Sequence, residues 1–360
     1  MASQTTDNTA DILQAIERLI EERGIRIVHS GVRSLKDVIS SLPESVLVLE
    51  PTNGDTTLPS ISRDHLLTEL EQIERARTLP RARYYLDRLR RSLVEVKTRK
   101  INDINLNRWK EYKTILTDSL WLLDRRDGSG GHSSWYWGNF VPQIPHQLMM
   151  RYTRSGEWVL DAFAGSGTTL LEARCLDRKC VGIELQASVA RKVRQGLKRN
   201  HSGNDTPTIG LEVGDSRTIN VKQVLRKYGT NSVQLVILHP PYHNIIRFSK
   251  NRRDLSNTRT VEDFAAQFGK VVDNVTPALD PGRVLAVVIG DKYEKGEWKP
   301  LGFMVMSEVL KRNYKLKSIV VKNFEDTTGK RSQKELWRFR ALAGGFYLFK
   351  HEYIFIFQKG

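Results

Sequence analysis

The stretch WVLDAFAGSGTTLLEARCLDRKCVGIEL, residues 158–185, carries the pattern on which the fold prediction rests. An apolar run at 158–163 is followed by a glycine-rich turn, a helical pattern at 168–176 and a second apolar run at 180–185. A strand, a crossover helix and a second strand in this order are typical of parallel strands in one sheet. The stretch therefore predicts the first unit of an α/β fold.

The alternation of apolar runs and helical patterns continues to the end of the chain. We expect further strands at 209–214, 233–238, 283–290, 316–324 and 351–359, and helices at 189–200, 221–229, 261–279 and 302–313. The last two strands are expected to form an antiparallel hairpin at an edge of the sheet. The predicted fold class is α/β, a doubly wound Rossmann-like sheet with an antiparallel edge hairpin and a smaller, mostly helical N-terminal region.

Charge divides the 360 residues into three regions. The chain has 57 Lys and Arg against 41 Asp and Glu, a net charge of +16. Residues 1–74 are acidic in balance, whereas residues 75–126 are strongly basic. We expect an acidic accessory domain at 1–74, a basic helical connecting region at 75–126 and the α/β domain at 127–360, which opens on the break DGSGGHSS. Aromatic residues lie among the cations of 75–126, so this region is either a solvated helix or a phosphate-contacting surface.

The acidic region has the pattern of a small folded unit. An apolar stripe predicts a helix at 11–23, and residues 34–42 predict a second helix with Ser34 as its N-cap. The turn-rich PTNGDTTLPS and a helix through 66–74 follow. This order resembles a winged-helix arrangement, but the acidic balance argues against a role as the main DNA grip.

Composition excludes several classes of protein. No apolar run approaches the ~20 residues of a membrane span. The first residues lack the basic start and apolar core of a secretory signal. Two cysteines, Cys175 and Cys180, supply neither a disulfide framework nor a cysteine-rich zinc site. We therefore expect a cytoplasmic protein with no bound metal and no membrane partner, and the charge favours nucleic acid as its partner.

The turn at 161–169 predicts a ligand site. Its glycines allow a sharp turn and a close approach of the backbone to a ligand. The spacing is neither the dinucleotide G-x-G-x-x-G pattern nor a Walker loop. Glu184 ends the next strand and can accept both hydroxyls of a ribose, while Asp215 follows the third strand and can meet an adenine amino group. Together they predict a nucleoside site across the carboxyl ends of three strands.

His239, Pro240, Pro241 and Tyr242 directly follow the strand at 233–238. Two prolines cannot continue a central strand, because each lacks the N–H that the ladder needs. They form a rigid turn with outward carbonyls and an aromatic side chain. We expect this turn to lie beside the nucleoside site.

Five segments in a consistent order resemble the motifs of S-adenosylmethionine-dependent amino-group DNA methyltransferases, which modify adenine N6 or cytosine N4. They are DAFAGSGTT, VGIEL, GDSR, HPPY and the terminal HEYIFIFQK. WYWGNFVPQIPHQLMMRYT, residues 135–153, looks like the family segment over the methionine end of the cofactor. The resemblance covers residues 120–360, and its glycine motif is like the β class in an order closer to the γ class.

The resemblance implies a mechanism. The target base is flipped from the helix and stacks on Tyr242, while the Pro240 carbonyl and the first residue of the tetrapeptide accept hydrogen bonds from the amine. Methyl transfer from the sulfonium is then direct. Phe163, Gly165 and Gly167 would contact S-adenosylmethionine, with Glu184 on its ribose, Asp215 on its adenine and Asp161 near its amine.

His239 departs from the family pattern, in which Asp, Asn or Ser opens the tetrapeptide. A neutral imidazole can still accept one hydrogen bond, so the chemistry is retained, but the target base is not readable. An unperturbed histidine gains a proton below ~6.5, which predicts loss of activity at lower pH.

The best candidates for DNA contact are cations in the loop that follows the tetrapeptide: Arg247, Lys250, Arg252 and Arg253. Residues 322–342 form a second basic candidate. The expected partner is double-stranded DNA, and a companion restriction endonuclease, the recognition sequence and the oligomeric state stay open. Two alternatives to a DNA methyltransferase are an RNA base methyltransferase and a catalytically silent nucleic-acid-binding protein.

Overall fold

The computed structural model describes residues 2–42, 61–128, 135–199, 207–323 and 334–360. The chain forms two compact units, one of residues 1–100 and 104–114 and the other of residues 101–103 and 115–360. Each unit buries its own hydrophobic core. Within the described residues, no helix is both long enough and apolar enough to cross a membrane.

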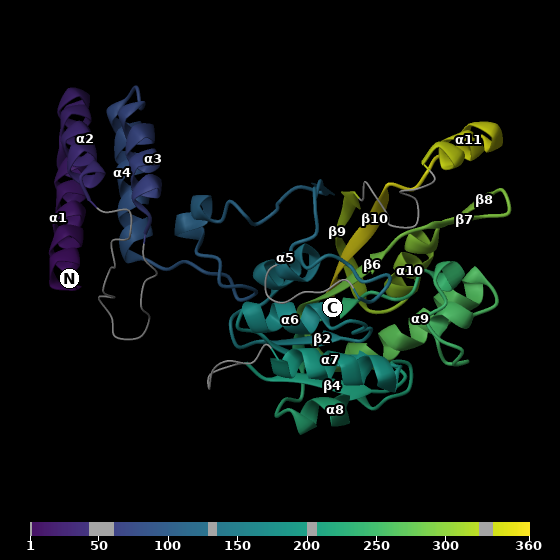
Figure 1. Cartoon of the computed structure of the whole chain (residues 1–360). Helices are drawn as coiled ribbons and strands as arrows, with labels where there is room; N and C mark the ends of the chain where they lie inside the picture. The colour runs from purple at the N-terminus through teal and green to yellow at the C-terminus, as the bar shows by residue number, and fades with distance from the viewer. Residues whose placement is uncertain (1, 43–60, 129–134, 200–206, 324–333) are drawn as a thin grey trace. The chain divides into compact units, whose positions relative to one another are not determined.

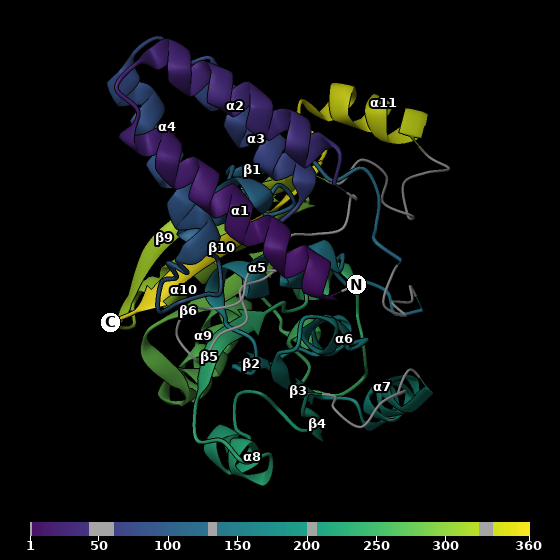
Figure 2. The same ribbon diagram turned by 90° about the vertical axis from the view of Figure 1, so that its left-hand side faces the viewer.

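The N-terminal unit is a packed set of helices, which Figures 1 and 2 show side by side. Its described elements are α1 (Ala2–Glu21), α2 (Ile25–Ser40), α3 (Arg63–Glu74), α4 (Leu79–Val94) and the short 3-10 helix η1 (Leu106–Glu111). Each α-helix turns an apolar stripe inward, as Ile16, Val32, Leu70 and Leu86 illustrate. Gly31 allows α1 and α2 to approach closely, because a Cβ there would lie 2.4 Å from Leu19 Cδ2.

Two expectations for this region need correction. The predicted N-cap at Ser34 is wrong: α2 begins at Ile25 after Gly24, and the Ser34 hydroxyl donates to the Ser30 carbonyl within the helix. The predicted boundary after residue 74 lies inside one unit, because α4 shares a core with α1, α2 and α3. The turn-rich PTNGDTTLPS and most of the glycine break DGSGGHSS lie outside the described residues.

The second unit is built on one mixed sheet (Figure 1). In the described residues its strand order is β1-β9-β10-β6-β5-β2-β3-β4. The strands are β1 (Leu120–Trp121), β2 (Trp158–Asp161), β3 (Lys179–Glu184), β4 (Ile209–Val213), β5 (Val233–Leu238), β6 (Leu279–Ile289), β9 (Tyr314–Asn323) and β10 (His351–Lys359). β7 (Lys292–Glu294) and β8 (Glu297–Lys299) form a separate small hairpin.

The predicted parallel core and antiparallel hairpin are both confirmed. Strands β4, β3, β2, β5 and β6 run parallel, whereas β10 pairs antiparallel with β9 and with β6. The structure adds β1, a two-residue strand parallel to β9 at the outer edge. The last strand of the chain is therefore internal to the sheet and bonded on both sides.

Helices cover both faces of the sheet (Figure 2). One face packs against α5 (Gln143–Tyr152), α6 (Thr168–Cys175) and α7 (Ala187–Arg199), and the other against α8 (Val221–Lys227), α9 (Val261–Val275) and α10 (Leu301–Leu310). Within β5, Leu235 and Ile237 join the first core while Val236 and Leu238 join the second. α11 (Lys334–Gly344) precedes β10. This doubly wound arrangement confirms the predicted fold class.

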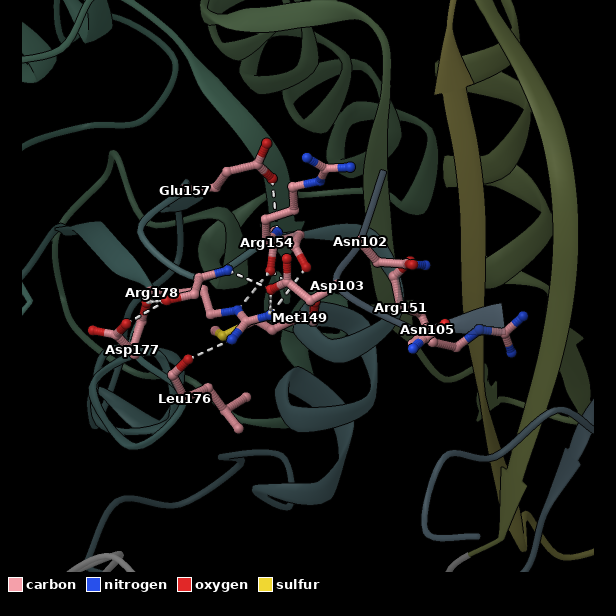
Figure 3. A network of polar contacts seen from close by, with 12 residues as sticks. Asn102, Asp103, Asn105, Met149, Arg151, Arg154, Glu157, Leu176, Asp177 and Arg178 are labelled. Atoms are coloured by element: carbon pink, nitrogen blue, oxygen red, sulfur yellow. Dashed lines mark hydrogen bonds and ion pairs between the residues drawn. The ribbon is translucent and has the colours of Figure 1, made fainter. Parts of the chain in front are cut away.

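A polar network fixes residues 101–103 at the amino end of β3 (Figure 3). The guanidinium of Arg178 is buried and donates to Asp103 Oδ2 at 3.0 Å and to the carbonyls of Leu176 and Thr153. Asn102 donates to the Arg151 carbonyl at 2.8 Å. The network lies at the edge of the sheet opposite to the carboxyl ends of the parallel strands.

Candidate active site

The predicted site residues meet at the carboxyl ends of four neighbouring parallel strands. β5, β2, β3 and β4 are adjacent in the sheet, and each ends at one of the segments that the sequence singled out (Figure 2). Ligands bind at this edge of open α/β sheets, because the connections there lead into helix N-termini. The geometry therefore gathers these segments around one region.

The glycine turn uses backbone conformations that other residues rarely adopt. Gly165 has φ +48° and Gly167, the residue before α6, has φ +79°. A Cβ on Gly167 would lie 2.6 Å from Val193 Cγ1 of α7, and one on Gly165 would lie 3.1 Å from the ring of Tyr136. Both positions therefore need glycine for conformation and for space.

Glu184 joins the second strand to this turn. One of its oxygens accepts a hydrogen bond from Gly165 N at 3.0 Å, and the other accepts one from Gln186 N at 2.8 Å. Burial raises the pKa of Glu184 to about 7. The buried Asp161 accepts from Phe163 N at 2.9 Å, and burial raises its pKa to about 6. The edge thus holds two carboxyl groups that protonate close to neutral pH.

Asp215 lies beside Glu184, since Gly214 N donates to the Glu184 carbonyl at 3.0 Å. Its carboxylate, however, is paired with Arg217, whose Nε and Nη2 donate at 3.0 and 2.7 Å. Burial alone would raise the pKa of Asp215, but the hydrogen bonds from Arg217 outweigh it and lower the pKa. Arg217 also donates to the Arg253 carbonyl and to Gln267, so it links the third strand to the basic loop and to α9.

The tetrapeptide begins directly after β5, beside the first strand of the nucleoside site. His239 is half-buried, and its ring packs edge-on against Phe140 with ring centroids 4.7 Å apart. Burial lowers the pKa of His239 to about 4. The premise of an unperturbed histidine is therefore not met, and the pH at which the ring would lose its acceptor moves from ~6.5 to about 4.

Tyr242 is held by a buried ion pair that the sequence analysis did not assign. Its hydroxyl donates to Glu352 Oε2 at 2.7 Å, and Glu352 Oε1 lies 3.0 Å from Lys322 Nζ. The Tyr242 ring fits against Gly290, where a Cβ would lie 3.0 Å from the ring. A signal for the pair was present, because Glu352 and Lys322 are charged residues inside otherwise apolar strand patterns.

Residues 135–140 reach the same edge. Tyr136 stacks on Phe248 of the loop after the tetrapeptide, with centroids 5.6 Å apart and an interplanar angle of 17°. Burial and the nearby carboxylates of Glu184 and Asp254 raise the pKa of Tyr136. Residues 135–153 are expected near the cofactor as a segment, and WYWGNF within it is the only sequence signal that points to Tyr136.

The predicted DNA-contact cations lie on the ordered loop that carries Phe248. The loop is braced by its own hydrogen bonds, from Ser249 Oγ to Asp254 and from Asn257 to the Ser249 carbonyl. Four predicted side chains on it are solvent-exposed: Arg247, Lys250, Arg252 and Arg253. In the second basic candidate, residues 324–333 lie outside the described residues.

The basic region 75–126 contributes cations to a groove of the N-terminal unit. The groove is open and has a volume of about 710 Å³. Its basic lining residues are Arg75, Arg77, Arg81 and Lys110, and Arg81 lies over the ring of Tyr85 at 4.9 Å. Of these cations, Lys110 is paired with the buried Glu69. No cluster of three or more metal-ligating side chains occurs among the residues that the structure describes.

Comparison with known proteins adds a family to this geometry. The family model described as DNA methylase matches residues 56–195 and 233–360, about three quarters of the chain. The chain belongs to this DNA methylase family. A second model, described as conserved hypothetical protein 95, matches residues 147–267. Members of the DNA methylase family are methyltransferases, and S-adenosylmethionine is their cofactor.

The family match fits the site unevenly. It includes the glycine turn, Glu184 and the tetrapeptide, and it begins upstream of the resemblance drawn from motifs alone. The match leaves out residues 196–232, so Asp215 lies in a segment that the family model does not cover.

Individual relatives are more distant. A Type II methyltransferase of Methanothermobacter thermautotrophicus is 42% identical over 43 residues, which are 12% of this chain and 12% of that protein. A methyltransferase structure from Pyrococcus furiosus shares 16% identity over 61% of this chain and 84% of that one, with a TM-score of 0.38. An S-adenosylmethionine-dependent methyltransferase from Methanosarcina mazei shares 13% identity over 59% and 96%, with the same score.

Proposed function

We propose that this protein transfers a methyl group from S-adenosylmethionine to the exocyclic amine of a flipped base in DNA, at cytosine N4 or adenine N6. The observation that carries the proposal is the adjacency of β5 and β2 in the sheet. It sets the tetrapeptide of His239 to Tyr242 next to the glycine turn, so that an amine and a methyl donor can share one strand edge.

The residues present fit the cofactor. The turn around Gly165 and Gly167 offers backbone where a Cβ would fill the space, and Glu184 offers a buried carboxyl group for two ribose hydroxyls. When bound, the cofactor supplies a methyl group on a positively charged sulfur. We assign Asp161 to the neighbourhood of its amine and Phe163 to a contact with it.

Asp215 has a different status from Glu184. Its carboxylate already accepts two hydrogen bonds from the side chain of Arg217. A carboxylate has further lone pairs, so an adenine amino group can still donate to it, with Arg217 fixing its orientation.

At the amine, the chain supplies hydrogen-bond acceptors and a stacking surface. An exocyclic amine is a poor nucleophile because its lone pair is delocalised into the ring, and acceptors that bond its hydrogens localise that pair. The Pro240 carbonyl and the neutral ring of His239 are the proposed acceptors. Tyr242 is the proposed stacking partner of the flipped base, with Pro241 keeping the turn rigid.

The loop after the tetrapeptide is the proposed DNA contact. Arg247, Lys250, Arg252 and Arg253 are exposed, and Phe248 packs their loop against Tyr136 beside the glycine turn. Cations in this place can bind the phosphates that flank a flipped base. We retain the α/β unit as the catalytic domain and the helical unit as an accessory domain.

Transfer of labelled methyl groups tests the proposed function. Purified protein is incubated with labelled S-adenosylmethionine and either mixed-sequence duplex DNA or total RNA, and the products are digested to nucleosides for mass spectrometry. We expect N4-methylcytosine or N6-methyladenine from the DNA. Tyr242→Ala should abolish the product and leave DNA binding nearly unchanged.

Two results would contradict the proposal. Label in RNA alone would make the protein an RNA methyltransferase. Transfer to neither substrate by a protein that binds DNA would support the catalytically silent alternative. Sequencing of DNA from expressing cells with modification-sensitive reads would then give base, position and recognition sequence together.

A further inference from the structure

A chain of three contacts connects His239 to a buried ion pair. Nε2 of His239 lies 3.2 Å from the Tyr242 hydroxyl, which lies 2.7 Å from Glu352 Oε2, and Glu352 Oε1 lies 3.0 Å from Lys322 Nζ. Glu352 and Lys322 are direct cross-strand partners on β10 and β9, and both side chains are more than nine-tenths buried. The chain therefore runs from the first residue of the tetrapeptide into the interior of the sheet.

The donors and acceptors in this chain can be ordered from its inner end. An ammonium group only donates, and the carboxylate that it faces only accepts. The Tyr242 hydroxyl therefore gives its hydrogen to Glu352. Burial and the charge of Glu352 raise the pKa of Tyr242, so the phenol keeps that hydrogen.

The direction of these hydrogen bonds decides which ring nitrogen of His239 carries a proton. Once the Tyr242 hydrogen points at Glu352, the hydroxyl oxygen can only accept from the histidine, and Nε2 must be protonated to donate to it. A neutral imidazole has one N–H and one lone pair, so the lone pair is then on Nδ1. Among the described residues, Nδ1 of His239 has no hydrogen-bond partner.

We infer that Glu352 and Lys322 are positioning residues, which act through Tyr242 to hold the proton of His239 on Nε2 and leave Nδ1 as the acceptor offered to the substrate amine. The role of the amine rests on the proposed function, whereas the placement of the proton does not. Asp, Asn and Ser carry an oxygen that accepts in any state. A histidine needs an outside group to choose its tautomer.

The inference can be tested without activity. The full-length protein is labelled with ¹⁵N-histidine, and the ring nitrogen shifts of His239 are read near pH 7.5, with His239→Asn identifying its signals. We expect the pattern of the Nε2–H tautomer. In Glu352→Gln the amide can donate to Tyr242, which frees the hydroxyl hydrogen for the histidine, so we expect a shift toward Nδ1–H. Tyr242→Phe keeps the ion pair but removes the hydroxyl that connects it to His239, so we expect a mixture of the two tautomers. This variant tests the inference if Glu352→Gln fails to fold.

Turnover provides the second readout. Glu352→Gln should lower kcat at least tenfold while the Kd for S-adenosylmethionine stays the same. In the His239→Asn background the same substitution should cost less than threefold, because an amide oxygen needs no tautomer. A matched control is Glu157→Gln, which removes a carboxylate paired with Arg283 ahead of β2 and should leave the tautomer unchanged.

An Nδ1–H pattern in the unmodified protein would overturn the inference, as would an Nε2–H pattern that persists in both Glu352→Gln and Tyr242→Phe. If Glu352→Gln lowered kcat equally in the unmodified protein and in the His239→Asn background, the positioning role would be overturned. An Nε2–H pattern in a protein that methylates no nucleic acid would support the proton placement and contradict the proposed function.

Discussion

The proposed ribose contact of Glu184 would couple the protonation of its buried carboxyl group to cofactor binding. Its pKa is raised to about 7, so part of the population is protonated at neutral pH. Ribose hydroxyls donate to the ionised form and therefore favour it, which lowers the pKa on binding. Because about three quarters of the population is protonated at pH 6.5, we predict that binding of S-adenosylmethionine at this pH releases up to about 0.7 proton and that the release vanishes above about pH 8.5.

Calorimetry in buffers of different ionisation enthalpy measures this release. Glu184→Gln should abolish it and weaken binding at least tenfold, since hydrogen bonds to a charged acceptor contribute ~1.5–3 kcal/mol each. Glu297→Gln removes an exposed carboxylate and should change neither quantity. Undiminished release in Glu184→Gln would assign the proton to another group.

His239 gives the second prediction at the scale of one residue. Its pKa is lowered to about 4 by burial, and protonation would remove its acceptor. The acceptor is therefore present above about pH 4 and is lost as the pH falls through that value. At saturating cofactor and DNA, kcat should be flat from pH 8 to pH 5.5.

A pH profile of kcat, with circular dichroism to confirm folding at each pH, measures this. His239→Asn should be flat over the same range and should also lack any acid limb near pH 4, because an amide does not titrate there. An acid limb near pH 6.5 that disappears in His239→Asn would show that burial does not lower this pKa.

At the scale of elements, Gly167 combines two demands at the start of α6. Its φ of +79° disfavours any side chain, and a Cβ would overlap Val193 of α7. We predict that Gly167→Ala lowers the free energy of unfolding by ~1–2 kcal/mol from backbone strain and by a further ~1–3 kcal/mol from overlap.

Chemical denaturation can separate the two contributions. Gly156 has φ +75° and nothing within 4 Å of its would-be Cβ, so Gly156→Ala reports strain alone and should cost less. In a Val193→Ala background the cost of Gly167→Ala should fall toward that of Gly156→Ala. Equal costs of the two glycine substitutions in the unmodified background would mean that overlap with Val193 contributes nothing.

The start of α2 shows a local capping preference that is outweighed by burial of an apolar stripe. Ser34 is a good N-cap by type, yet α2 starts nine residues earlier, because Val28 and Val32 belong to the same apolar stripe as Leu35 and Ile39. Burial of two valines contributes more than a cap of ~1 kcal/mol. The strands and helices of the α/β unit, by contrast, follow their predicted ranges closely, because their periodicity and their burial agree.

At the scale of the whole molecule, the net charge of +16 should appear as salt-dependent DNA binding. Each phosphate contact contributes ~0.9 to the slope of log K against log salt. Replacing the exposed Arg247, Lys250, Arg252 and Arg253 with Gln should therefore reduce that slope by up to ~3.6. Fluorescence anisotropy with labelled duplex DNA measures it.

A variant of equal charge change tests whether position matters. Lys222, Arg226, Lys315 and Lys317 are exposed cations of the same unit outside the loop. Their replacement with Gln should reduce the slope much less. If both quadruple variants behave alike, general charge rather than the loop accounts for DNA binding.

The sequence alone determined the fold class and the place of the candidate site. Apolar runs that alternate with helical patterns predict parallel strands. Parallel strands bring their carboxyl ends to one edge of the sheet, so Asp161, Glu184 and the tetrapeptide had to lie near one another. Only the tertiary structure decided how these groups behave. Burial lowers the pKa of His239 and raises that of Glu184. Arg217 forms an ion pair with Asp215.

The buried pair of Glu352 and Lys322 is the clearest case of what the fold alone decides. Its existence depends on β10 lying between β6 and β9, a pairing of segments far apart in the chain. Desolvation and cross-strand contact are properties of the folded surroundings of a residue and not of its neighbours in sequence. For that reason the residue types of the site could be read from the chain, whereas their protonation and their partners could not.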